Sequence, residues 1–387
     1  MAAEAPRETV EVAASPAIGG WQGTGRYLPP GEVLAIEVAE GAGWRVRIGC
    51  HADGLWGAES WARWPEITLE RAIAAGETRL ASPFGGPVYL IAGPGAGPLR
   101  AKLAGTVAAP RYVRDDPASV AAWAERRGAP GPWAELEGRH LVLSVPSAAV
   151  RDLADPAPVL EYWDSVVLSH CDLGGTPPPA VRERFVGDAQ IAAGYMHSGY
   201  PIMTWLDVVT PPASGGPAPV LDLEVLRREG NWGYFHELGH NRQRPEWTFA
   251  GTGEVTCNLF TLYTMEKVAG IPAREHDALS GAKAAREGFL ARGAPFAEWQ
   301  ADPFLALLTY AEVQRELGWE PFRAVFREYE ALAAEARPRE EQEKIDQWVR
   351  RLSRAAGRDL RPHHRAWGWP LGAALAADPE LAALPPF

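Results

Sequence analysis

Two histidines of this chain stand four positions apart, with a glutamate directly after the first. The segment His236-Glu237-Leu238-Gly239-His240 is an H-E-x-x-H pattern. On a helix, side chains four residues apart lie on one face, so both imidazoles can reach one zinc ion at about 2.0–2.1 Å. Glu237 lies beside that line of ligands, where a carboxylate can take a proton from a metal-activated water. The pattern therefore predicts a metal-dependent hydrolytic centre with Glu237 as the catalytic base.

The residues around the pattern decide how much weight it carries. A chain with nine histidines contains such a pattern by chance in roughly two cases per hundred. Here the neighbours Trp232, Tyr234, Phe235 and Leu238 are aromatic or apolar, which predicts a helix with much of its surface buried. Histidines in such a helix need polar partners or a metal. The alternative is a solvated helix face with two incidental histidines.

A catalytic zinc site has three protein ligands and a water. No histidine follows about ten residues after His240, so the third ligand must be of another kind. Glu254 is the candidate, because it opens the next expected helix directly after the turn Gly251-Thr252-Gly253. The alternative role for Glu254 is a favourable interaction with the dipole at that helix N-terminus. Asn241, Thr256 and Asn258 stand near the ligands and either orient them by hydrogen bonds or lie on a helix surface.

A second candidate segment lies between glycines and a proline, from Gly194 to Pro201. It holds Tyr195, His197 and Tyr200, whose hydroxyl or imidazole groups could contact a substrate or stabilise an oxyanion. The alternative is a buried turn with core aromatics. Three tryptophans offer ring faces for a sugar, or else fill the core: Trp205, Trp232 and Trp247.

Charge and composition exclude several classes of protein. The formal net charge is −11, whereas binding to nucleic acid or anionic lipid needs a basic surface. No apolar stretch is long enough to span a membrane, and residues 1–20 lack the pattern of a signal peptide. The three cysteines, Cys50, Cys171 and Cys257, have no metal-binding spacing. We expect three buried thiols, although one disulfide stays open.

The expected fold class is α+β. Residues 1–16 are expected to be disordered, and residues 17–113 to form a β-rich, sandwich-like unit with strands near 31–38, 44–49 and 87–92. Residues 114–387 are expected to form the catalytic unit, which is mostly helical from about residue 221. Helices are expected over 156–170, 231–242, 253–268, 280–292, 302–317, 320–335 and 339–356.

Several segments together resemble one known family. These are Asp188–Ile191, Gly194–Met203, Trp232–Asn241, Trp247–Phe249 and Gly253–Leu259. They are similar to the enhancin-like, mucin-targeting zinc metallopeptidases (peptidase family M sixty), whose pattern is H-E-x-x-H followed after a variable gap by Glu. The resemblance extends from the Trp21–Tyr27 region to the C-terminal helices. It implies a zincin-like catalytic unit after a small β-rich unit.

The resemblance also implies a function. It implies one Zn2+ held by His236, His240 and Glu254, with Glu237 activating water. The implied substrate is an O-glycosylated protein such as mucin, cut next to a glycosylated Ser or Thr, at an extracellular or cell-surface location. Three alternatives stay open: a zinc endopeptidase that ignores glycans, a glycan-binding protein with a vestigial peptidase domain, and an intracellular protein with a regulatory role.

Overall fold

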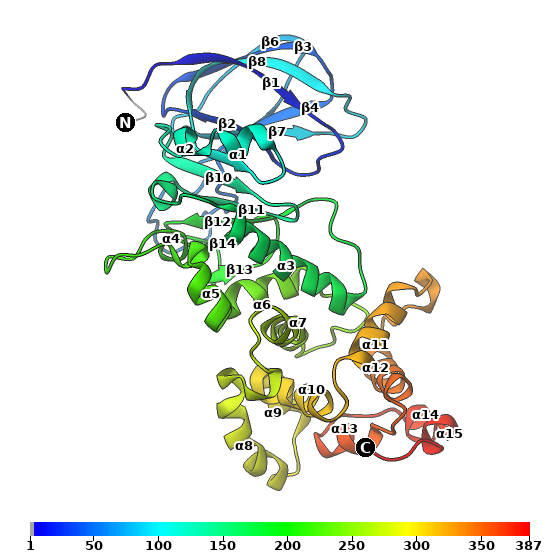
Figure 1. Cartoon of the computed structure of the whole chain (residues 1–387). Coiled ribbons are helices and arrows are strands. Elements are labelled where there is room, and N and C mark those ends of the chain that lie inside the picture. The colour runs from blue at the N-terminus through cyan, green and yellow to red at the C-terminus, as the bar shows by residue number, and fades with distance from the viewer. Residues whose placement is uncertain (1–3) are drawn as a thin grey trace. The chain divides into compact units, whose positions relative to one another are not determined.

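The computed structural model describes residues 4–387 of the chain (Figure 1). Contacts between residues divide it into two compact units. The first contains the residues up to Ser165 together with Pro179–Leu226, and the second contains Val166–Pro178 together with Arg227–Phe387. The α+β class expected from the sequence is confirmed: the first unit holds the sheets, and the second is mostly helical.

Within residues 4–387, the first unit opens with an eight-stranded sheet. Its order is β5-β4-β7-β2-β8-β3-β6, with β1 also paired to β8, and its neighbouring strands are antiparallel. The sheet curls so that both of its halves cover one apolar core (Figure 1). The strands are β1 Glu8–Ala14, β2 Gln22–Leu28, β3 Val33–Glu40, β4 Trp44–Ile48, β5 Leu69–Ala72, β6 Gly76–Ala81, β7 Gly86–Ala92 and β8 Leu99–Ala108.

Alternation of apolar and polar residues explains these strands. In β4, Trp44, Val46 and Ile48 are buried while Arg45 is exposed, because successive side chains of a strand point to opposite faces. The expected disorder of residues 1–16 is wrong for β1. Its Val10, Val12 and Ala14 are half-buried against the core of the sheet, and pairing with β8 satisfies its backbone.

A second, six-stranded sheet lies in the same unit, again within the described residues. Its order is β13-β14-β12-β11-β10-β9, and it mixes parallel and antiparallel pairs. The long helix α3, Ala157–Gly174, begins after Asp155, which accepts a hydrogen bond from the Ala157 amide. The remaining strands and α-helices before α6 are β9 Arg111–Val113, β10 Trp133–Glu137, β11 Leu141–Pro146, β12 Glu183–Asp188, β13 Met196–His197, β14 Ile202–Trp205, α1 Pro117–Ala121, α2 Trp123–Arg126, α4 Leu206–Val209 and α5 Leu223–Glu229.

The second unit packs its helices around one large aromatic core. In α12, for example, Ile345, Trp348, Val349 and Leu352 recur at helical spacing and are all buried. The helices are α6 Trp232–His240, α7 Gly253–Val268, α8 Ser280–Ala291, α9 Phe296–Ala301, α10 Pro303–Leu317, α11 Glu320–Glu330, α12 Glu341–Ala356, α13 Arg361–Ala366, α14 Ala373–Ala376 and α15 Pro379–Ala382. The expected longer helices are confirmed, and α11 ends five residues before its expected limit.

Further expectations concern cysteines and membranes. Cys50, Cys171 and Cys257, all within the described part of the chain, are buried and form no disulfide. Among residues 4–387, no helix combines the length and the apolar character needed to cross a bilayer.

The second unit is expected to lose stability in acid through a buried histidine. His364 is buried, with Nδ1 2.9 Å from the Leu360 carbonyl oxygen. Burial lowers the pKa of His364 from 6.5 to about 3. The unfolded chain therefore takes up this proton below about pH 6.5 while the folded protein does not. The free energy of unfolding is therefore unaffected by His364 above about pH 6.5. Between about pH 6.5 and pH 3 it falls by up to about 1.4 kcal/mol for each pH unit of acidification.

Thermal unfolding measured between pH 7.5 and 4.5 checks this expectation. The melting temperature of the wild type should fall as the pH is lowered, and that of His364→Gln should fall less steeply. An identical slope in the two proteins would contradict the assignment.

Candidate metal centre

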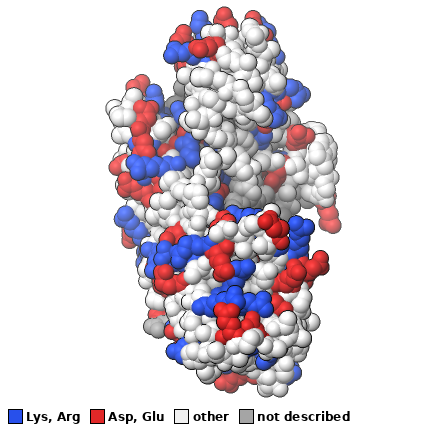
Figure 2. Space-filling model, turned by 90° about the vertical axis from the view of Figure 1, so that its right-hand side faces the viewer, with Lys and Arg blue, Asp and Glu red and all other residues white. Residues whose placement is uncertain are grey.

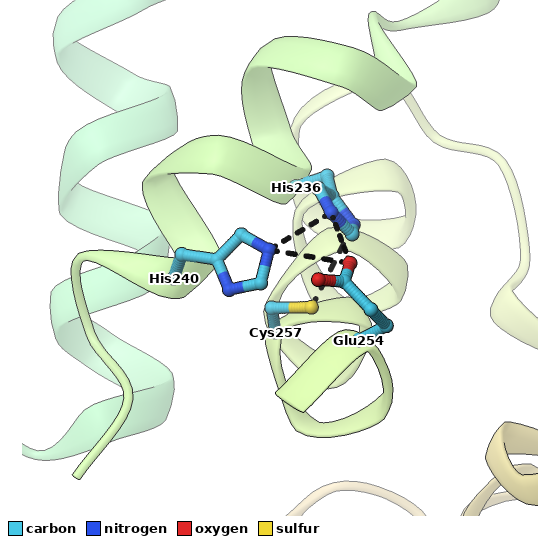
Figure 3. Close-up of side chains that lie close together, drawn as sticks. All are labelled: His236, His240, Glu254 and Cys257. Atoms are coloured by element: carbon cyan, nitrogen blue, oxygen red, sulfur yellow. Dashed lines mark hydrogen bonds and ion pairs between the residues drawn. The ribbon is translucent and has the colours of Figure 1, made fainter. Parts of the chain in front are cut away.

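The candidate site is built on α6 and α7 of the second unit. Asn231 caps α6, because its side chain accepts a hydrogen bond from the Tyr234 amide. The helix thereby places His236 and His240 on one face. Glu254 stands in the first turn of α7. The three predicted ligands thus come from two neighbouring helices, as Figure 3 shows.

A glycine allows these two helices to approach closely. A Cβ added at Gly239 would lie 2.4 Å from the carbonyl oxygen of Cys257 and 3.0 Å from its carbonyl carbon. Real Cβ atoms are not found this close to backbone atoms, so α6 can lie against α7 here only without a side chain. The glycine inside the H-E-x-x-H pattern is therefore a packing requirement of the site.

The three potential ligand atoms converge on one point (Figure 3). His236 Nε2 and His240 Nε2 are 3.0 Å apart. Glu254 Oε2 lies 3.1 Å from the first and 3.4 Å from the second. Atoms bound to one tetrahedral zinc at about 2.0–2.1 Å lie about 3.3–3.4 Å from each other. The spacing of the three atoms therefore fits a common metal ion.

Hydrogen bonds on the far side of His236 fix which of its ring nitrogens donates. The Asn258 amide nitrogen donates to the Glu254 carbonyl oxygen, which can only accept. Asn258 Oδ1 therefore faces His236 Nδ1, at 2.8 Å. Since an amide oxygen accepts, Nδ1 must carry a proton, and in the neutral ring Nε2 then presents a lone pair.

Gln243 does the same for His240. Its amide nitrogen donates to the Gly253 carbonyl oxygen and to Thr256 Oγ1, both at 2.6 Å. Its Oε1 thus faces His240 Nδ1, at 2.8 Å, so that Nε2 of this ring, when neutral, also presents a lone pair. Two bare nitrogens and a carboxylate oxygen repel one another unless a cation or a proton lies between them. The donor set therefore fits a metal such as zinc.

Glu237 and Cys257 complete the surroundings of the site. Glu237 is buried on α6, one residue beyond His236, and it is not among the converging ligand atoms. Cys257 Sγ lies near the same group but 3.6 Å from His236 Nδ1, the ring nitrogen that faces away from the ligand atoms. Burial first, and then the Glu254 carboxylate, raise the pKa of the Cys257 thiol.

The sequence indicated some of the residues that hold the two histidines in place. Asn258 and Thr256 make the contacts just described, whereas Asn241 forms the C-cap of α6 through its backbone, which bonds to the Glu237 and Gly239 carbonyl oxygens. Gln243 was missed. Its position three residues after His240, directly past the helix end, was the available signal, because side chains three apart can meet.

Replacing Gln243 by leucine is expected to weaken metal binding. The variant keeps the side-chain size but removes the acceptor that fixes the proton on His240 Nδ1, and such partners commonly contribute 10- to 100-fold in metal affinity. We expect a zinc dissociation constant about 10–100 times higher, measured by competition with a fluorescent chelator. Gln347→Leu is a matched control, since Gln347 bonds only to Arg351 on α12 among the contacts seen. Equal affinity in both variants would contradict the role of Gln243.

The other predicted substrate residues lie in the first unit. Tyr195 donates to Asp207 Oδ2 at 2.6 Å, and burial followed by this carboxylate raises the pKa of Tyr195 to about 12. His197 Nε2 lies 2.8 Å from Asp53 Oδ2. Tyr200 Oη accepts from the Trp21 amide, and the indole of Trp205 donates to the Gly194 carbonyl oxygen. None of the four is a buried core residue.

The two predicted tryptophans of the second unit differ from each other. Trp232 is half-buried, with its ring 4.8 Å from that of His276 and 5.8 Å from that of Phe304. Trp247 is only 2% exposed and packs against Phe260 and Phe326. A ring enclosed on all sides cannot stack on a sugar, so the sugar-binding role is wrong for Trp247.

Fold and site define a class of protein: a metallopeptidase fold with a His-His-Glu group that can hold a metal ion. The model of the peptidase M60, enhancin and enhancin-like family matches residues 105–368, and that of the N-terminal domain of M60-like peptidases matches residues 3–101. The chain therefore belongs to the peptidase M60, enhancin and enhancin-like family.

Individual proteins are similar to this chain in sequence or in structure. TRPM8 channel-associated factor 2 of Bos taurus is 39% identical over 97% of this chain, which spans 41% of that protein's length. A functionally unknown conserved protein of Bacillus anthracis superposes with a TM-score of 0.77 at 21% identity, covering 98% of this chain and 80% of its own. IMPa of Pseudomonas aeruginosa in complex with an O-glycopeptide superposes with a TM-score of 0.67 at 19% identity, covering 99% and 52%. These structural likenesses show the fold.

Proposed function

We propose that the chain is a zinc metalloendopeptidase acting on O-glycosylated, mucin-type proteins, which it cleaves next to a glycosylated Ser or Thr. The observation that carries the proposal is the convergence of three potential ligand atoms, from His236, His240 and Glu254, within 3.4 Å of one another. Glu237 stands beside them on the same helix as the two histidines. This combination suits hydrolysis, since a site for storage or structure has no need of an adjacent base.

The residues divide the chemistry among themselves. When bound, the metal supplies polarisation of the scissile carbonyl and a lower pKa for a nearby water. Glu237 takes the proton of that water and delivers it to the leaving amine. Asn258 and Gln243 hold the two imidazoles in the tautomer that offers Nε2 inward.

The substrate class rests on relatives and on charge. IMPa, which shares the fold, is known in complex with an O-glycopeptide. On the face shown in Figure 2, basic and acidic side chains are interspersed, and the net charge is −11. A protein substrate is therefore favoured over nucleic acid. We propose an extracellular or cell-surface location, where such glycoproteins are exposed.

Digestion of paired peptides tests the proposal. An O-glycosylated mucin-type peptide and its sugar-free twin are incubated with the protein, with and without a chelator, and the products are read by mass spectrometry. We expect chelator-sensitive cleavage of the glycosylated peptide alone. Cleavage of both peptides would point to a metallopeptidase without glycan dependence. Cleavage of neither by the zinc-loaded protein would contradict the proposed activity.

One observation favours a second candidate function. The identity to TRPM8 channel-associated factor 2, 39% over 97% of this chain, is higher than that to IMPa. A role in binding a membrane protein partner, with or without catalysis, is the corresponding alternative. Cleavage that depends on Glu237 would favour the first function, whereas co-purification with a channel by a chain lacking turnover would favour the second.

A further inference from the structure

The loop between β4 and β5 exposes three tryptophans within nine residues. This tryptophan loop, residues 51–67, carries Trp56, Trp61 and Trp64, which are 66%, 49% and 63% exposed. Large apolar side chains that gather on a surface usually mark a binding site. Each of the three exceeds the exposure of Trp205, which the sequence had singled out instead.

The loop is held in place from within. The Leu55 amide donates to the Pro65 carbonyl oxygen at 2.9 Å, which closes the loop, and both residues are buried. The indole of Trp61 donates to the Leu55 carbonyl oxygen at 3.0 Å. Trp56 meets Trp61 edge to face, with ring centres 5.8 Å apart. The rings of Trp56 and Trp61 are therefore ordered before any ligand arrives, which lowers the entropic cost of binding.

The loop is also tied to the segment after β12, within the same unit. Arg63 forms an ion pair with Asp188 at 2.7 Å, and both side chains are buried. Gln190 accepts from the Ala62 amide and donates to the Ser60 carbonyl oxygen. Asp53 meets His197 at 2.8 Å. The tryptophans and the segment around His197 thus belong to one connected surface.

Charge narrows the ligand class. Arg63 is the sole Lys or Arg among residues 51–67, and its charge is paired with that of Asp188. Glu59 and Glu66 are exposed, so the loop repels anionic lipids and nucleic acids. The rings of Trp56 and Trp61 already contact each other edge to face. Aromatic faces beside hydrogen-bond acceptors suit a neutral ligand that has both C–H faces and hydroxyl groups.

We propose that the tryptophan loop is a carbohydrate-binding surface for neutral, hydroxyl-rich glycans. The C–H face of a sugar ring packs on an indole, and sugar hydroxyls donate to the carboxylates of Glu59 and Glu66. The surface does not require the metal centre or cleavage. The choice of an O-glycan as the probe rests on the proposed function, but the site itself does not.

Binding to immobilised mucin tests this proposal. The full chain carrying Glu237→Gln is used in the presence of a chelator, so that the probe is not consumed. Its binding is compared on O-glycosylated mucin, on the deglycosylated form and on phosphatidylcholine vesicles. The same measurements are made after adding Trp56→Ala, Trp61→Ala and Trp64→Ala together, after adding Trp56→Ala alone, and after adding Val120→Ala as an exposed apolar control in the same unit.

We expect binding to glycosylated mucin only, at least about tenfold weaker in the triple variant, intermediate with Trp56→Ala and unchanged with Val120→Ala. If the triple variant does not fold, the single variant Trp56→Ala still tests the proposal, provided that its melting temperature shows that it is folded. Equal binding by all variants, equal binding to deglycosylated mucin, or tryptophan-dependent binding to vesicles would each overturn the proposal. Because no turnover is measured, a failure here is distinct from a failure to cleave glycopeptides.

Discussion

Replacing Glu237 by glutamine is expected to reduce peptide hydrolysis by about 10²- to 10⁴-fold while the metal stays bound. The substitution keeps the size of the side chain but removes the group that accepts the proton of the attacking water. Metal binding should persist, because Glu237 is not among the atoms that converge with Glu254 Oε2. Turnover of an O-glycopeptide and zinc content by elemental mass spectrometry measure the two properties on one sample.

Glu254→Ala is the matched control. It removes one of the three converging atoms, so zinc content and activity should fall together. Loss of metal in Glu237→Gln would mean that Glu237 is a ligand. A fully metallated and active Glu254→Ala protein would remove Glu254 from the site.

The ligands of this site could be predicted because their signals are local. The spacing of His236 and His240 fixes their common face on any helix, and Glu254 follows a turn that starts the next helix. Asn231 before α6 and Pro245 beyond its end are local signals of the same kind, because asparagine caps helix starts and proline cannot lie inside a helix. Each of these inferences needs only a few neighbouring residues.

Features that depend on contacts between distant elements could not be predicted from the sequence. The burial of Trp247 follows from packing against Phe326, 79 positions along the chain in another helix, and no local pattern distinguishes it from the exposed Trp56. Residues 8–14 looked disordered because a short Ala- and Glu-rich strand is stable only when it pairs with β8. Tertiary context overrides composition in both cases.

Gly239 lies within the local H-E-x-x-H pattern, but a glycine is needed there because of a tertiary contact between α6 and α7. Gly239→Ala is expected to destabilise the second unit and to weaken metal binding together. The new Cβ would stand 2.4 Å from the Cys257 carbonyl oxygen, so the helices must separate. Separation moves the histidines of α6 away from Glu254 on α7. Overpacking of this kind costs about 1–3 kcal/mol, more than the roughly 1 kcal/mol that alanine gains over glycine in a helix.

The opposite sign is expected for Gly281→Ala on α8, where an added Cβ meets no atom within 4 Å. There the helix propensity acts alone, and stability should rise by up to about 1 kcal/mol. Melting temperatures and zinc dissociation constants of the two variants separate the effects. If Gly239→Ala keeps the wild-type values of both, the close contact of α6 with α7 is not what positions the ligands. If it loses zinc affinity while Gly281→Ala does not, the approach of the two helices sets the geometry of the metal centre.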